Sequence, residues 1–146
     1  MSILALDIGD KRVGAALSQG RLARPIGWFE RGRGVAERQI VELVAKEKVT
    51  QVIVGIPLNA DNTLGPQARK CVRFARRLQR RVTAAFIFVD EFSSTCEASA
   101  LEGIAQGGEK GVLDARSASI LLQSFLDGKT VPIGEHVLNQ EVDQSI

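Results

Sequence analysis

Apolar residues in the first thirty positions form three short runs separated by turn-forming residues. The first two runs are ILALDI at residues 3–8 and RVGAALS at residues 12–18, and the sequence Gly-Asp-Lys at residues 9–11 separates them. Because glycine admits positive φ at little cost, this spacing predicts a β-hairpin. A third run, PIGWFE at residues 25–30, predicts a strand that extends the meander.

The remainder of the chain alternates between helical periodicity and short apolar runs. Apolar residues recur at helical spacing over residues 36–48, 66–81 and 113–127, which predicts three amphipathic helices. Runs rich in β-branched and aromatic residues at 51–58 and 84–91 predict two strands that helices cover on both faces.

The order of these elements predicts an α/β fold with one mixed sheet. A right-handed crossover places the fourth strand beside the first, so we expect a five-stranded sheet of order 3-2-1-4-5 with helices on both faces. Ser94 and Glu97 form a capping box, which predicts one more helix after the fifth strand. Residues 1–130 form the predicted domain, and residues 131–146, with weak periodicity, are expected to be a flexible C-terminal tail.

Length and composition fit one globular domain. The chain has 146 residues, of which 45% are hydrophobic and 25% charged, and these values argue against disorder and against a membrane span. The N-terminus lacks the features of an export signal, and Cys71 and Cys96 lack CxxC spacing, so we expect reduced thiols in a cytoplasmic protein. The formal charge of +2 is small, so any nucleic-acid surface depends on where basic residues cluster.

Acidic residues stand at the ends of several predicted elements. Asp7 lies near the end of the first strand, Asp90 and Glu91 end the fifth strand, and Asp114 opens the last predicted helix. In the predicted sheet these ends meet at one rim, near the switch point where such sheets bind ligands. Crowded carboxylates repel one another. A divalent cation such as Mg²⁺ or Mn²⁺ would offset that repulsion and support hydrolysis of phosphodiester bonds.

Two points about these acids stay open at this stage. Successive residues of a strand point to opposite faces, so only one of Asp90 and Glu91 can readily join Asp7, and spacing does not choose between them. Each acid alone also has a simpler explanation, because Asp7 could cap a turn and Asp114 could cap a helix. The expected metal ligands are therefore Asp7, Asp114 and either Glu91 or Asp90.

The second predicted helix carries the strongest cluster of positive charge. Arg69, Arg73, Arg76 and Arg80 repeat at helical spacing and form a stripe that could follow a phosphate backbone. An ordinary solvated helix surface explains the same stripe equally well. The stripe is therefore one of two candidate contacts to nucleic acid.

The other candidate contacts lie in loops near the predicted rim. Lys11 and Arg12 stand at the hairpin tip close to Asp7, where they could hold a phosphate near the point of cleavage. Asn59 begins the turn-forming loop after the fourth strand and is a further candidate for binding nucleic acid.

Four blocks of sequence together resemble a known family. The blocks are LALDIGDKRVGAALS, VIVGIPLNADNTLGPQAR, VDEFSSTCEA and LDARSASILLQSFLD, and they extend over residues 3–127. In this order and spacing they resemble the YqgF (RuvX) family of RNase H-like proteins, described as Holliday junction resolvases and pre-16S ribosomal RNA nucleases. The resemblance implies an RNase H-like nuclease domain over residues 1–130, in a bacterial cytoplasmic protein.

The resemblance also implies a role for each acid. Asp7 matches the acid of the family's first strand, Asp90 and Glu91 match its acidic pair, and Asp114 matches its late helical acid, with Glu91 favoured as the middle ligand. The implied activity is that of a two-metal endonuclease, with Asp7, Glu91 and Asp114 catalytic and Mg²⁺ or Mn²⁺ as cofactor. The implied substrate is the 5′ end of pre-16S rRNA, with branched DNA as the alternative and ribosomal particles as further partners.

Departures from the family pattern support other hypotheses. Phe92, Ser93 and Ser94 follow the acidic pair where the family usually has arginine, leucine and threonine, so a non-catalytic RNA- or ribosome-binding module is a second hypothesis. Asp61 and Asn62 replace the usual turn ending in glycine, and asparagine tolerates positive φ. The DxG motif before a hairpin also occurs in actin-like and sugar-kinase-like ATPases, but this chain lacks the length and the second DxG element for their second lobe. The sequence distinguishes neither RNA from DNA nor a monomer from a homodimer.

Overall fold

The first thirty residues fold into an antiparallel meander. A computed structural model describes residues 1–91 and 109–139 of the chain. Its first three strands are β1 (Ser2–Ile8), β2 (Arg12–Ser18) and β3 (Arg24–Glu30). Because β1 pairs with β2 and β2 with β3, both antiparallel, the predicted hairpin and third strand are confirmed.

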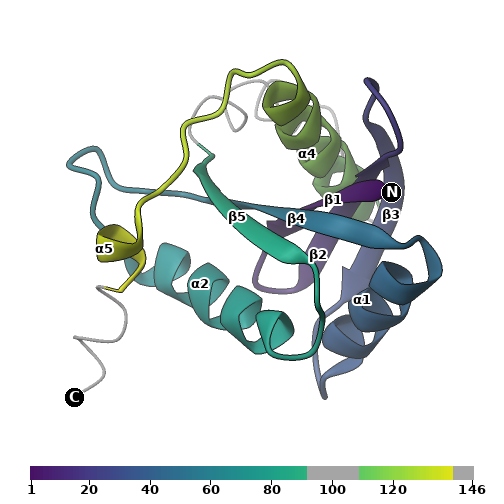
Figure 1. The fold of residues 1–146 in the computed structure, drawn as a ribbon. Coiled ribbons are helices and arrows are strands. Elements are labelled where there is room, and N and C mark those ends of the chain that lie inside the picture. The colour runs from purple at the N-terminus through teal and green to yellow at the C-terminus, as the bar shows by residue number, and fades with distance from the viewer. Residues whose placement is uncertain (92–108, 140–146) are drawn as a thin grey trace.

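Two further strands extend the sheet in parallel with β1. Helix α1 (Val35–Lys46) leads to β4 (Val49–Ile56), and helix α2 (Pro66–Gln79) leads from β4 to β5 (Ala85–Asp90). β4 pairs with β1 and β5 pairs with β4, both parallel, which gives the sheet order β3-β2-β1-β4-β5 (Figure 1). The predicted five-stranded mixed sheet and its order are confirmed.

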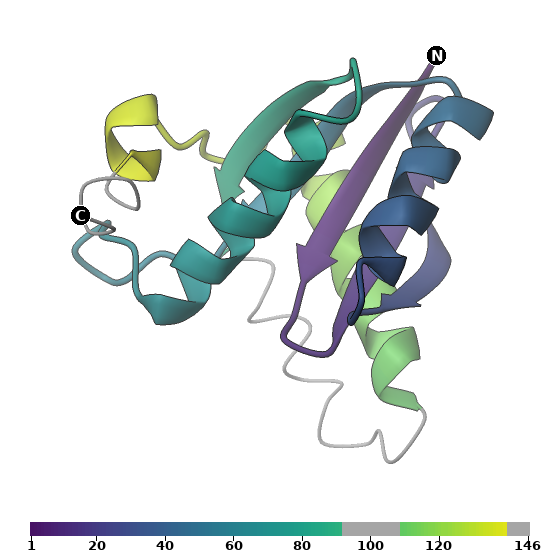
Figure 2. The same ribbon diagram turned by 90° about the horizontal axis from the view of Figure 1, so that it is seen from below.

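Helices cover both faces of the sheet, as predicted. α1 and α2 lie on one face, and α4 (Glu109–Leu126) lies on the other (Figures 1 and 2). The bounds of α4 include residues ahead of residue 113, where the sequence predicted its start. Gly111 does not interrupt this helix, because it is buried against Trp28 of β3, where an added Cβ would overlap the indole ring. The helix predicted from Ser94 lies outside the described residues.

Alternation along β1 produces two cores of different size. Leu4, Leu6 and Ile8 belong to the larger core, under α1 and α2, whereas Ala5 belongs to a smaller cluster under α4. The smaller cluster consists of Ala5, Ala16, Ile53, Val89, Ala118, Leu121 and Leu122. Since burying a large apolar side chain contributes roughly 1.5–3 kcal/mol, the larger core supplies most of the hydrophobic stabilisation.

The segment after α4 pairs with β5, within the range from residue 131 where the sequence predicted a flexible tail. The amide of Asp90 donates to the carbonyl of Val131 at 3.0 Å, and the amide of Ile133 donates to the carbonyl of Phe88 at 2.8 Å. These bonds cover the outer edge of β5. An exposed strand edge recruits a short segment through its backbone, and such pairing leaves no periodicity in the sequence.

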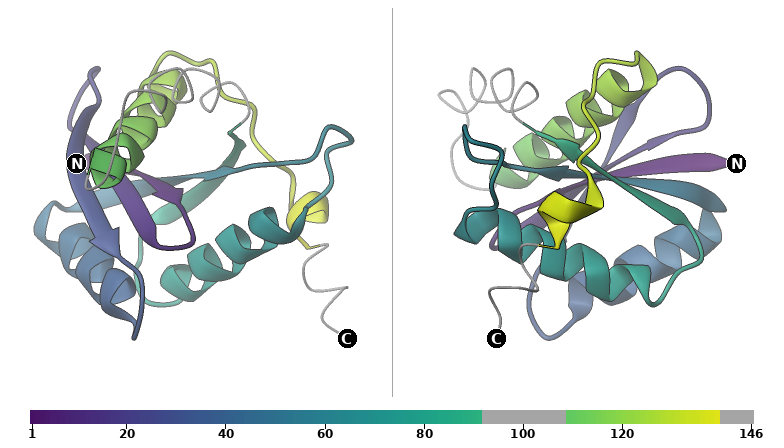
Figure 3. Two further views of the ribbon diagram at one scale, coloured as in Figure 1. Left: turned by 180° about the vertical axis from the view of Figure 1, so that it is seen from behind. Right: turned by 60° about the vertical axis from the view of Figure 1, so that its left-hand side comes forward.

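A short helix follows this edge segment and packs beside α2. Helix α5 (Glu135–Leu138) places Leu138 in the larger core with 2% of its surface exposed. Glu135 forms an ion pair with Arg76 of α2 at 3.0 Å, so α5 lies beside that helix (Figure 3). The last part of the predicted tail, residues 140–146, lies outside the described residues.

Candidate functional site at the sheet rim

Asp7 lies on the face of the sheet that α4 covers. Its neighbours Leu6 and Ile8 point into the core under α1 and α2, so alternation turns Asp7 toward α4. Its cross-strand partner on β2 is Gly14, and a Cβ added at Gly14 would overlap the backbone of Asp114 in α4. The glycine therefore allows α4 to approach the strand pair that carries Asp7.

Glu91 lies on the same face as Asp7, whereas Asp90 lies on the other face. Phe88 belongs to the core under α1 and α2, and Val89 belongs to the cluster under α4. The alternation continues through Glu91, because its amide donates to β4 at 3.1 Å and extends the ladder. The strand phase thus supports Glu91, the residue that the family resemblance favoured, as the acid that joins Asp7.

A second glycine makes room for the side chain of Glu91. A Cβ added at Gly55 of β4 would lie 3.2 Å from the carboxyl carbon of Glu91. The parallel pairing of β1 with β4 extends to Leu6 and Val54, which sets Gly55 next to Asp7. The carboxylate of Glu91 therefore lies over the strand that neighbours Asp7.

The sequence predicted that Asp114 opens the last helix. In the structure, Asp114 instead lies inside α4, more than one turn beyond the first residue of the helix. Its Oδ2 accepts a hydrogen bond from Nε of Arg12 at 2.8 Å. The two side chains are 29% and 23% exposed, so solvent screens this ion pair less than an open surface pair. The helix-cap explanation for Asp114 is therefore wrong, and Arg12 contacts an acid of the rim.

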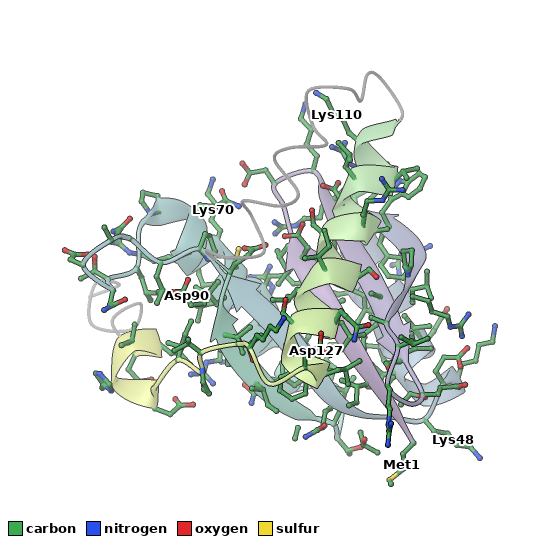
Figure 4. The ribbon with its side chains drawn as sticks, turned by 90° about the horizontal axis from the view of Figure 1, so that it is seen from above. Met1, Lys48, Lys70, Asp90, Lys110 and Asp127 are labelled. Atoms are coloured by element: carbon green, nitrogen blue, oxygen red, sulfur yellow. The ribbon has the colours of Figure 1, made fainter. Side chains whose placement is uncertain are left out.

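The three acids thus come to one side of the rim from β1, the end of β5 and α4. Figure 4 looks onto this face, with Lys110 of α4 at one end of the sheet and Met1 and Lys48 at the other. Among residues 1–91 and 109–139, no group of three or more His, Cys, Asp or Glu is arranged to hold a metal ion. The donor chemistry still fits Mg²⁺ or Mn²⁺, which take carboxylate oxygens. Asp114 would have to exchange Arg12 for such a cation.

The turn between β1 and β2 is held by contacts to its backbone. The amide of Gly9 donates to the carbonyl of Arg12 at 2.9 Å, and Arg31 donates from Nη1 to the carbonyl of Gly9 at 2.8 Å. Gly9 does not have the positive φ that the sequence suggested. A Cβ there would instead lie 3.0 Å from the carbonyl oxygen of Arg12, so close approach explains the glycine. On the same turn, Asp10 pairs with Lys70 of α2 at 3.6 Å.

The predicted arginine stripe lies on α2, on the face of the sheet away from α4, and it is only partly exposed; it consists of Arg69, Arg73, Arg76 and Arg80. Arg73 and Arg80 are exposed, as is Lys11 at the hairpin tip. Arg76 instead packs toward β5 and α5. Its guanidinium lies 5.2 Å from the ring centroid of Phe88 and pairs with Glu135, so this member of the stripe stabilises the fold.

The loop between β4 and α2 has the backbone conformation that the sequence allowed. Asn62 has a φ of 64°, so asparagine takes the left-handed conformation in this turn, as predicted. Asn59 is exposed, and its Nδ2 donates to Oγ1 of Thr63 at 3.0 Å. Asn59 and Asp90 border a hollow of about 330 Å³ beside the loop. Asp90 thus faces this loop and not the acids under α4.

Cys71 is a buried free thiol, as predicted, and the pKa of this thiol responds to the charges of nearby acids. Its Sγ donates to the carbonyl of Ile8 at 3.3 Å. Burial raises the pKa of this thiol to about 12, and the charges of Glu91 and Asp7 add to the shift. The two acids therefore lie within electrostatic range of one buried group. Cys96 lies outside the described residues.

Sequence analysis did not single out the two glycines that shape the rim. Gly14 and Gly55 stand inside β2 and β4, one on each side of Asp7. Glycine weakens a strand and offers nothing to pack, so its presence there marks a close approach of another group. Isolated glycines in two apolar strands were thus the signal that could have predicted how near α4 and Glu91 lie to Asp7.

Comparison with known proteins identifies relatives along almost the whole chain. Residues 1–128 match a family model described as "RuvX: Holliday junction resolvase". A protein of Synechococcus sp. (strain JA-2-3B'a(2-13)), named "Putative pre-16S rRNA nuclease", is 39% identical over 142 residues, which cover 92% of this chain and 83% of that protein. A protein of the same name from Caldanaerobacter subterraneus is 35% identical over 136 residues, which cover 88% of this chain and 98% of that protein.

A solved structure shares the fold at low sequence identity. It is described as "T. thermophilus RuvC in complex with Holliday junction substrate", and it matches with a TM-score of 0.59 and 12% identity. The match covers 91% of this chain and 99% of that chain. The chain therefore has the RuvC-like RNase H fold that the family resemblance implied. In the described parts of the chain, no helix is long and apolar enough to cross a membrane.

Proposed function

Because the chain belongs to the RuvX family, we propose that it is a metal-dependent nuclease that hydrolyses phosphodiester bonds in the 5′-end processing of pre-16S rRNA. The names of its relatives support the substrate. The proposal is supported by the positions of Asp7, Glu91 and Asp114, which come from three elements to the α4 side of the sheet. Carboxylates that gather on one face favour positive charge nearby, and a bound cation would supply it.

The acids of the rim would hold one or two Mg²⁺ or Mn²⁺ ions. When bound, such ions activate water for attack and stabilise the departing oxygen in phosphodiester hydrolysis. Asp7 is the central ligand in this proposal, because β1 fixes it between the strands that carry Gly14 and Gly55. Glu91 and Asp114 complete the set from the two flanking elements.

Basic residues on two surfaces would hold the nucleic acid. Lys11 stands exposed at the hairpin tip near the rim, and Arg12 lies beside Asp114. Arg73 and Arg80 are exposed on α2, where they could contact phosphates of the strand that flanks the cleavage point, and the partly buried Arg69 is a further candidate. The Nε of Arg69 is buried and makes no hydrogen bond within the described part of the chain, so this side chain would have to reorient to contact a phosphate.

Branched DNA is the second candidate substrate. It is favoured by the description of the matching family model as a Holliday junction resolvase and by the likeness of the fold to RuvC. A resolvase that cuts two strands symmetrically would act as a homodimer, whereas a nuclease that trims one RNA end can act as a monomer. The oligomeric state therefore accompanies the choice of substrate.

A parallel cleavage assay on both polymers tests the proposal. Wild-type protein is incubated with Mg²⁺ or Mn²⁺ and either a pre-16S rRNA 5′ segment or a four-way DNA junction. Asp7→Asn is compared with Asp10→Asn, a matched control in the same turn whose side chain pairs with Lys70. We expect cleavage of the RNA, a loss of roughly 100-fold or more in Asp7→Asn, and a change of less than about threefold in Asp10→Asn.

Each of the other possible results of this assay would support a different function or mechanism. Undiminished activity in Asp7→Asn would remove the rim from the mechanism. Cleavage of the junction alone would favour the second candidate, with a dimer expected in the same buffer. Salt-dependent RNA binding without turnover, in protein verified as folded, would favour a non-catalytic RNA- or ribosome-binding module.

A further inference from the structure

The ion pair between Arg12 and Asp114 gives the acidic rim a positive charge from the chain itself. Nε of Arg12 donates to Oδ2 of Asp114 at 2.8 Å, and both side chains are partly buried. We propose that Arg12 is an internal counter-ion of the rim, which competes with a divalent cation for Asp114. The inference rests on the proposed function, because it concerns the same acids.

The backbone positions the two partners of this ion pair. Arg12, Gly14 and Ala16 lie on the α4 face of β2 by alternation, and Ala16 belongs to the cluster under α4. Gly14 touches the backbone of Asp114 directly. The approach of α4 to β2 therefore fixes where the carboxylate and the guanidinium meet, and the ion pair does not depend on two flexible surface chains.

Two neighbouring basic residues, Arg31 and Lys70, contact groups other than Asp114. Arg31 donates to the carbonyl of Gly9 and lies 4.8 Å from the ring centroid of Phe74. Lys70 pairs with Asp10 on the hairpin turn. Arg12 is the basic residue of this region that contacts Asp114, so it is the one expected to respond when Asp114 changes its partner.

Exchange of partners at Asp114 would change the role of Arg12. The guanidinium at Oδ2 of Asp114 repels a cation that approaches the same carboxylate, so each positive charge weakens the binding of the other. When Asp114 takes a cation, the guanidinium is released at the rim, where its planar donors suit a phosphate oxygen. Arg12 is then a positioning residue that couples loading of the rim with cation to contact with nucleic acid.

Mn²⁺ binding without nucleic acid measures this competition directly. Calorimetry at low salt compares the wild type with Arg12→Gln, Arg12→Lys and Lys11→Gln, the last being a neighbouring variant with the same loss of charge. We expect Arg12→Gln to bind Mn²⁺ about three- to tenfold more tightly than the wild type, and Lys11→Gln to change the affinity by less than about twofold. Arg12→Lys keeps the charge and should lie nearer the wild type.

Two further measurements separate competition from a general change in charge. In an Asp114→Asn background, Arg12→Gln should give no further gain in Mn²⁺ affinity, because the partner of Arg12 is gone. In the wild type, titration with Mg²⁺ should shift the NMR signal of the Arg12 Nε–H and speed its exchange with water. This second readout does not require any variant to fold.

The outcomes distinguish this inference from the proposed function. Equal Mn²⁺ affinity in the wild type and Arg12→Gln, with the Arg12 Nε–H signal unchanged by Mg²⁺, would overturn the competition and leave metal-dependent cleavage intact. Absence of Mn²⁺ binding in every variant would contradict the proposed function and this inference together.

Discussion

The two faces of the sheet bury different kinds of side chain. Toward α1 and α2, β1 presents Leu4, Leu6 and Ile8, which keep the helices a full side chain away from the strand. Toward α4, the same strand presents Ile3 at its start and then Ala5 and Asp7. Large apolar residues thus stabilise one face, while small residues on the other face allow a helix to approach the strands.

The difference shows what places the acids together. On the α4 face, the missing side chains of Gly14 and Gly55 admit the backbone of Asp114 and the side chain of Glu91 on either side of Asp7. Of the four arginines in the stripe on α2, Arg73 and Arg80 are exposed, so close packing of this kind does not fix them. The acids are therefore positioned by close packing around the two glycines, whereas the exposed arginines Arg73 and Arg80 are not.

Of the substitutions considered, we expect Gly14→Ala to have the largest effect on stability, because it disturbs the close packing of α4 on β2. In Gly14→Ala the new Cβ overlaps the backbone of Asp114, so α4 must move away from β2. We expect the free energy of unfolding to fall by about 3 kcal/mol, as measured by urea denaturation.

Gly20→Ala is the matched control for this prediction. An added Cβ at Gly20 meets nothing within 4 Å. We expect a change of less than about 1 kcal/mol in either direction. Equal destabilisation of the two variants would mean that the close approach of α4 has no special importance.

The buried thiol of Cys71 tests the packing on the α2 face of the sheet, because its burial makes stability depend on pH. Its pKa is raised from 9.0 to about 12, so the folded protein favours the protonated thiol. The resulting stabilisation is complete below pH 9 and is lost as the pH rises toward 12, because the unfolded chain ionises first.

This prediction is measured in a Cys96→Ser background. Between pH 8 and about pH 10.5, the free energy of unfolding should fall by roughly 1–2 kcal/mol more with Cys71 present than with Cys71→Ala. Urea denaturation at a series of pH values gives both curves. Parallel curves would show that the thiol is not buried as the structure places it.

The smallest effects on stability are expected for Arg76 and Arg80, two members of the arginine stripe that differ in their contacts. Arg76→Gln removes the contacts with Phe88 and Glu135 and should lower the free energy of unfolding by about 0.5–1 kcal/mol. Arg80→Gln, at an exposed position, should leave stability unchanged.

We expect the opposite order for nucleic-acid binding, where Arg80→Gln should have a larger effect than Arg76→Gln. Arg80→Gln should reduce the slope of log affinity against log salt by about one, and Arg76→Gln should change it less. Binding measured by fluorescence anisotropy at several salt concentrations gives the slopes. Equal slopes in Arg80→Gln and the wild type would remove Arg80 from the basic surface.

Much of the fold could be predicted because its signals are local. The β-branched runs in β4 and β5 indicated buried strands, and one rule of handedness then gave the sheet order. The segment at residues 131–138 was missed because it depends on the free edge of β5, which exists only after the sheet has formed. Helix α4 begins before the predicted residue 113, and its Gly111 packs against Trp28 of β3, a contact that the sequence does not announce.

The structure places Asp7 and Asp114 on one face of the sheet, as expected, although Asp114 lies inside α4 and not at its start. Their role as metal ligands stays a prediction. The choice between Asp90 and Glu91 depended on the phase of β5, and a strand that is apolar on both faces does not reveal its phase. The ion pair of Arg12 with Asp114 joins residues far apart in sequence, so no local pattern announces it.

The most direct test of the account compares Glu91→Gln with Asp90→Asn in Mg²⁺-dependent cleavage of the substrate that the wild-type protein cuts. The two residues are adjacent and lose the same charge, but only Glu91 lies on the α4 face with Asp7. We predict a loss of roughly 100-fold or more in Glu91→Gln and a change of less than about threefold in Asp90→Asn. Equal losses in the two variants, or a larger loss in Asp90→Asn, would contradict a site built on that face.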